Sequence, residues 1–157
     1  MHKFWLFFAI LFLVVSPNGK AFAGVTTIQE LNFGEFIVKN NDAVHSITVN
    51  ITGTAYTFDA AGFIPIDVSN IQPGIYDLDG MTPGALISSV DVTQVLPLSG
   101  GGGPNFQLTA FQDSHPTNVD GSGVVRVRVG ATAQTNGAGI RYFDQTYTGT
   151  MQIQVNF

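Results

Sequence analysis

The last eight residues of the chain alternate between apolar and polar side chains. Met151, Ile153, Val155 and Phe157 are apolar, and the residues between them are glutamine or asparagine. Because successive side chains of a strand point to opposite faces of a sheet, this segment predicts a strand with one apolar face. That face continues to the final residue, whereas chain ends are ordinarily poorly ordered. We therefore expect this strand to be either built into a sheet core or recognised by an assembly partner.

The same period of two residues recurs along the chain in short pieces that are separated by turn signals. The predicted strands lie at residues 31–38, 45–52, 63–68, 75–78, 86–95, 105–112, 125–129 and 147–157. In the first of them, Leu31 and Phe33 are predicted on one face, with Phe36 and Val38 on the other. Pro65 restricts its strand to a sheet edge or a bulge. No window has a sustained period near 3.6 residues, so the pattern predicts an all-β sandwich or barrel.

The first 23 residues are predicted to be a secretory signal peptide. His2 and Lys3 form a basic start, residues 4–15 are apolar, and Ala21 and Ala23 are the small residues that precede a cleavage site. The twelve-residue apolar run is shorter than the roughly 20 residues that span a bilayer as a helix. We expect cleavage after Ala23, export to the periplasm or cell surface, and one mature domain over residues 24–157 without a membrane helix.

The composition of the mature chain argues against several classes of partner and site. Removing 23 of 157 residues leaves 134, with four basic residues against eleven acidic ones and a net charge of −7. Nucleic acid and anionic membrane surfaces are therefore not expected as partners. The chain contains no cysteine, so thiolate metal sites, thiol nucleophiles and disulfides do not enter the account.

The residues that could carry chemistry do not form a recognisable set. His45 and His115 are too few for a zinc site, and both are interpreted as surface or loop residues. Asp77 and Asp79 precede Gly80 in the manner of a calcium loop. The glutamate that closes such a loop is missing, so we interpret them as turn residues.

Signatures of common enzyme classes are also missing from the sequence. Glu30 and Glu35 are the only glutamates, and a glycosidase pair would require them to face one cleft. There is no Gly-x-Ser-x-Gly elbow, and the glycine run at 100–103 lacks the lysine and helix of a phosphate loop. The sequence thus predicts no enzyme, no metal site and no cofactor.

Several segments, in their order and spacing, resemble an exported bacterial family. They are Leu31-Asn32-Phe33-Gly34-Glu35-Phe36, the segment Ile71–Leu78, residues 123–132, and Tyr147-Thr148-Gly149-Thr150 with the strand that follows. Together they resemble the family called domain of unknown function 4402, whose members are similar to the spore coat U domain and to chaperone–usher pilin subunits. The resemblance covers nearly all of residues 24–157. It implies an immunoglobulin-like antiparallel β-sandwich with a structural or adhesive role.

The resemblance also implies which residues take part in assembly. In pilin relatives the last strand pairs with a periplasmic chaperone, and the groove beside it is later filled by the N-terminal strand of the next subunit. The implied residues of the assembly strand are Tyr147, Met151, Ile153, Val155 and Phe157, and those of a candidate N-terminal donor segment are Val25 and Ile28. This chain departs from its relatives because it lacks their common disulfide. Its segment before Leu31 is also so short that a donor strand there would bury little area.

The function predicted from these observations is a secreted, non-enzymatic, pilin-like surface subunit. It would associate by β-strand addition with a periplasmic chaperone and with like subunits. One alternative is a small outer-membrane β-barrel, because a terminal phenylalanine after alternating apolar residues also suits barrel insertion; the short strands and Pro65 argue against it. Another is a secreted carbohydrate-binding module or enzyme, in which exposed Tyr142 and Phe143 would stack on sugar rings.

Overall fold

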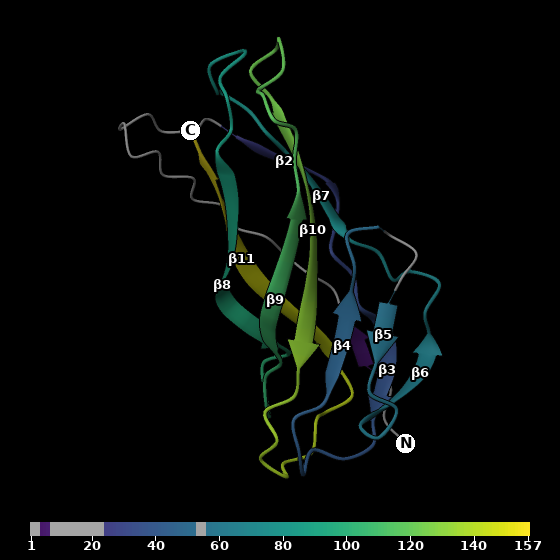
Figure 1. Cartoon of the computed structure of the whole chain (residues 1–157). Helices are drawn as coiled ribbons and strands as arrows, with labels where there is room; N and C mark the ends of the chain where they lie inside the picture. Colours follow the sequence, from purple (N-terminus) through teal and green to yellow (C-terminus); the bar gives the residue numbers. More distant parts are fainter. Residues whose placement is uncertain (1–3, 7–23, 53–55) are drawn as a thin grey trace.

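The computed structural model describes residues 4–6, 24–52 and 56–157. These residues form eleven strands in two sheets, which confirms the predicted all-β sandwich (Figure 1). In the part of the chain described, no helix has the length and apolar character needed to cross a bilayer.

The first sheet has five strands, in the order β6–β3–β1–β11–β8. Their bounds are β1 Phe4–Leu6, β3 Gly34–Val38, β6 Phe63–Asp67, β8 Ser89–Ser99 and β11 Thr146–Asn156. As Pro65 predicted, β6 lies at an edge of the sheet, and its register with β3 shifts beside that proline. An edge strand can carry a proline because one of its sides makes no ladder hydrogen bonds.

The second sheet is built around β10, the strand Val125–Gln134. The other members are β2 Val25–Gln29, β4 Ser46–Val49, β5 Tyr56–Phe58, β7 Gly74–Leu78 and β9 Gln107–Ser114. One edge of β10 pairs with β9, while β7 and β4 share its other edge, at residues 125–129 and 131–134 respectively. Gly130 lies at the junction, where a side-chain Cβ would approach the carbonyl oxygen of Val49 to 2.5 Å.

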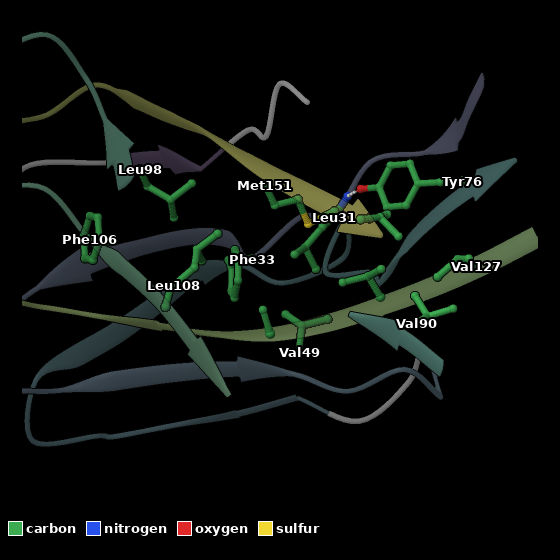
Figure 2. Packing of buried hydrophobic residues seen from close by; sticks show 14 of the residues in the cluster. Leu31, Phe33, Val49, Tyr76, Val90, Leu98, Phe106, Leu108, Val127 and Met151 are labelled. Carbon is green, nitrogen blue, oxygen red and sulfur yellow. Dashed lines mark hydrogen bonds between the residues drawn. The ribbon is translucent and has the colours of Figure 1, made fainter. Parts of the chain in front are cut away.

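The core lies between the sheets and is filled by alternate residues of the long strands (Figure 2). On β11 these are Met151, Ile153 and Val155, all fully buried, so the alternation of the last strand is used within this domain. Tyr76 of β7 is also buried, and its hydroxyl accepts a hydrogen bond from the backbone N–H of Leu31 (3.2 Å; Figure 2). Burial raises the pKa of this tyrosine well above its ordinary value, so the phenol stays neutral.

The predicted division of faces in the first strand segment was wrong. Leu31, Phe33 and Phe36 are all buried in one core cluster, and Val38 packs against it. The cause is Gly34, whose φ of 83° places it in the left-handed region. Such a residue adds one position to the strand, and this reverses the alternation that follows it.

The reversal at Gly34 has a second consequence. Because Phe36 and Val38 now face the core, Glu35 and Ile37 lie on the other face of β3. Both are nevertheless buried, with 6% and 7% of their surface exposed. Glu35 is therefore a carboxylate on the outer face of a sheet that is shielded from solvent.

We expect Gly34→Ala to lower the free energy of unfolding by about 2–4 kcal/mol, the combined effect of a positive φ and overpacking. An added Cβ there would lie 2.8 Å from both the carbonyl oxygen of Asp67 and Cγ1 of Ile71. Gly84 is the matched control, because it has a φ of 75° but no atom within 4 Å of an added Cβ.

Gly84→Ala should therefore cost only the conformational part, about 1–2 kcal/mol. Urea unfolding of the two variants measures the difference. Equal losses would contradict the close packing assigned to Gly34.

Candidate functional site

One strand of the first sheet comes from the predicted signal peptide. β1 runs antiparallel to β3, with Phe4 opposite Phe36 and Leu6 opposite Gly34. It runs parallel to β11, with Trp5 opposite Thr146. Among the described residues β3 and β11 do not pair with each other, so the sheet is continuous only through β1 (Figure 1).

We call the strand position between Gly34–Val38 and Thr146–Asn156 the β3–β11 slot. Removal of residues 1–23, as the sequence predicts, takes away the strand that occupies it. The other edge of β11 pairs with β8 along residues 148–156, and the other edge of β3 pairs with β6. Strand edges present backbone N–H and C=O groups that pair readily with an added strand. If residues 1–23 are cleaved, as the sequence predicts, the first sheet is left with one strand position to fill.

Aromatic rings connect the two walls of the slot from beneath. The ring of Phe36 on β3 lies 6.0 Å from that of Phe63, which lies 6.5 Å from Phe106. Phe106 in turn lies 5.0 Å from Tyr147 on β11, in an edge-to-face arrangement. All four side chains are buried, and such contacts add to the stabilisation from burial itself. The walls are therefore held in place by the core although their backbones do not pair.

Two tyrosine hydroxyl groups fix the segment that leads into β11. The hydroxyl of Tyr142 donates to the carbonyl of Asn105 (3.0 Å) and accepts from the N–H of Asn136 (3.2 Å). The hydroxyl of Tyr147 accepts from the N–H of Phe143 (3.1 Å) and donates to its carbonyl (3.2 Å). Burial raises the pKa of Tyr142 to about 12 and that of Tyr147 above its ordinary value, so both phenols remain neutral donors.

An open pocket extends the slot beyond the C-terminal end of β3. It lies between residues 37–42 and residues 139–142, and its lining includes Lys39 and Arg141. Since β1 runs antiparallel to β3, a longer strand in the same direction would begin in this pocket before it entered the slot. The two basic side chains thus lie at the end of the slot where an incoming strand would start.

The predicted assembly residues occupy two different environments. Tyr147, Met151, Ile153 and Val155 are fully buried and belong to the core of the domain. Phe157 follows the last strand and has 47% of its surface exposed. Tyr147 therefore lies beside β3 across the slot, whereas Met151, Ile153 and Val155 are core residues further along β11, past the end of β3.

The candidate donor segment forms β2 in the second sheet. Val25 lies opposite Leu78, and Gln29 lies opposite Ile75. Val25 packs against the core, whereas Ile28 is 52% exposed. In this structure the segment is an edge strand of its own domain, on the sheet that does not contain the slot.

One aromatic assignment from the sequence was wrong. Tyr142 was expected to be exposed, but only 1% of its surface is accessible because its ring stacks on Phe106 at 4.2 Å. His45 lies in the loop before β4, which is one of its two predicted positions, yet it is only 7% exposed. Its Nδ1 lies 2.6 Å from an oxygen of Asp59, and its Nε2 lies 2.8 Å from Asn40. The hydrogen bond from His45 is the main cause that lowers the pKa of Asp59.

The remaining candidates lie apart from the slot. Phe143 is 50% exposed. His115 lies 3.3 Å from Asp113 and is partly exposed. Asp77 of β7 accepts two hydrogen bonds from Arg126 of β10, at 2.7 and 2.8 Å, and this contact lowers its pKa. It is therefore one half of a cross-strand ion pair.

Sequence reasoning missed the role of β3 as one wall of the slot. The Leu-x-Phe-Gly segment resembles the opening of an exported bacterial family. The alternating pattern alone does not show that β3 pairs with β1 and so forms one wall of the slot. Comparison with protein-family models, curated proteins and solved structures gave no match. The geometry of the slot is thus the basis on which function is inferred.

Proposed function

We propose that the mature chain is a secreted, non-enzymatic structural or adhesive subunit that accepts an extended strand of another polypeptide into the β3–β11 slot. The observation that carries this proposal is the first sheet, which is continuous only through three residues of the predicted signal peptide. Export to the periplasm or cell surface is part of the proposal, because cleavage after Ala23 would leave the slot open.

The physical basis for strand addition is twofold. A strand in the slot would pair its backbone with β3 and β11, and this supplies affinity without dependence on sequence. Alternate side chains would be buried over the aromatic layer that contains Phe36 and Tyr147, at about 1.5–3 kcal/mol for each large apolar side chain. The burial of alternate side chains also sets the register of the added strand, since a shift by one residue turns every buried side chain outward.

The position of β2 bears on the identity of the partner. For a like subunit to donate residues 25–29, β2 would have to leave β7, with which it pairs from Val25 to Gln29. A strand from a separate protein, such as a periplasmic chaperone, meets no such cost. The proposed order is therefore capture of a partner strand first, followed by exchange with like subunits when β2 is released.

A synthetic strand should bind the exported chain and block its assembly. The probe is a nine-residue peptide, Thr-Leu-Thr-Leu-Gln-Leu-Thr-Leu-Thr, in which leucine occupies every second position. We expect one peptide per chain, a rise in melting temperature because the peptide binds only folded protein, and loss of multimers in analytical ultracentrifugation.

The matched control is a peptide of the same composition in which the four leucines are consecutive. It should have little effect, since it cannot bury its leucines on one face. Deletion of residues 151–157 would be less informative, because Met151, Ile153 and Val155 are core residues. An exported chain that is monomeric and does not bind the alternating peptide would contradict the proposed function.

A further inference from the structure

The wall of the slot contains a buried carboxylate without a hydrogen-bond partner. With β1 in the slot, Glu35 of β3 is only 6% exposed, and its Oε1 atom makes no hydrogen bond. A buried ionised group is costly unless it is paired. A strand in the slot therefore leaves a buried acceptor on β3, which a suitable side chain of that strand could satisfy.

The register of β1 shows which position of an incoming strand would meet Glu35. Trp5 lies directly opposite Glu35 on one side, and Asp67 of β6 lies opposite it on the other. Residues directly opposite each other in antiparallel strands share a face, with Cβ atoms about 4.5–5.5 Å apart. The residue that takes the place of position 5 is thus the neighbour of Glu35.

The other neighbour of Glu35 increases the need for positive charge. The carboxylate of Asp67 accepts hydrogen bonds from the N–H (2.8 Å) and hydroxyl (2.6 Å) of Ser69. These bonds lower its pKa, so it is an anion at neutral pH. A tryptophan carries no charge, whereas a lysine or arginine at that position would pair with Glu35.

The positions on either side of this residue require apolar side chains. They lie opposite Gly34 and Phe36, and Phe36 faces the core. We propose that the slot selects a strand with the pattern apolar–basic–apolar, in which the basic residue lies opposite Glu35. This proposal rests on the proposed function and names its partner as a separate polypeptide, because residues 25–29 of this chain, Val-Thr-Thr-Ile-Gln, contain no basic residue.

The test compares three peptides, Thr-Leu-Thr-Leu-X-Leu-Thr-Leu-Thr, with lysine, glutamine or glutamate at X. We expect the lysine peptide to bind the exported chain about tenfold more tightly than the glutamine peptide, as a charge-assisted hydrogen bond would provide. The glutamate peptide should bind most weakly. Titration calorimetry at low salt measures the three affinities.

Two variants make the assignment specific. In Glu35→Gln the preference for lysine should disappear, while in Asp113→Asn, which changes an acid on the second sheet, it should persist. Equal binding of the lysine and glutamine peptides to the unmodified chain would overturn this proposal and leave strand addition standing. If no peptide binds, strand addition itself fails.

A second inference concerns the start of the mature chain and does not depend on the slot. The backbone N–H of Asp79 donates to the carbonyl of Gly24 (3.2 Å), which extends the ladder of β2 and β7. The carboxylate of Asp79 packs directly against Gly24, where an added Cβ would lie 2.9 Å from one carboxylate oxygen. The other oxygen, Oδ1, is buried and has no hydrogen-bond partner.

Cleavage after Ala23 would convert the nitrogen of Gly24 into an α-ammonium group. This nitrogen is bonded to the Cα that would carry the added Cβ, and the hydrogen bond between Asp79 and Gly24 holds both residues in place. We infer that Asp79 forms an ion pair with the new N-terminus, so that processing supplies the partner that its carboxylate lacks. The geometry also favours glycine at position 24, since a side chain would be crowded by the carboxylate.

The test is the pKa of the α-amine in the exported protein, measured by NMR titration after its first residue is identified by mass spectrometry. A carboxylate partner should raise this pKa by about half a unit or more above the ordinary value near 8. Asp79→Asn should return it to that value, whereas Asp144→Asn, at an exposed acid, should not. The inference would be overturned if the α-amine had the same pKa in Asp79→Asn as in the unmodified protein, or if the first residue of the exported chain were not Gly24.

Discussion

Backbone pairing across the position of β1 is the interaction on which the first sheet depends. β3 and β11 are both walls of this position, and they are linked by a strand of three residues from the apolar N-terminal segment. Sheet edges that are left open pair with other strands. In the full chain β1 fills this position, and cleavage of the predicted signal peptide would leave it open inside the sheet rather than at its rim.

The core of this domain connects the two walls of this position. Phe36 and Tyr147 belong to one continuous aromatic layer that also includes Phe63 and Phe106. The hydrogen bonds of the Tyr147 hydroxyl further fix the beginning of β11. These contacts are the basis of the proposed strand addition, in which the identity of the added strand would decide what the protein assembles with.

Much of the fold could be predicted from the sequence, because alternation within one strand is a local property. The buried face of β11 followed directly from it, and the edge position of β6 followed from Pro65, which donates no ladder hydrogen bond. The reversal at Gly34 was missed, although the apolar positions change from 31 and 33 to 36 and 38 across a glycine, which is typical of a bulge. The burial of Tyr142 and His45 was also missed, because each depends on partners distant in the chain or on a loop conformation.

The slot could not be predicted from the sequence, because it lies between two strands that are about 110 residues apart in the chain. The strand that occupies it comes from a segment with the pattern of a signal peptide. Amide hydrogen exchange of β3 and β11 in the exported chain tests its existence most directly. The account predicts that the slot-facing amides of Gly34–Val38 exchange fast in the free chain and slowly once a strand is bound, while the β11 amides that face β8 are protected in both states. If the slot-facing β3 amides were protected as strongly in the free, monomeric chain as in the chain with a bound strand, the account would be contradicted.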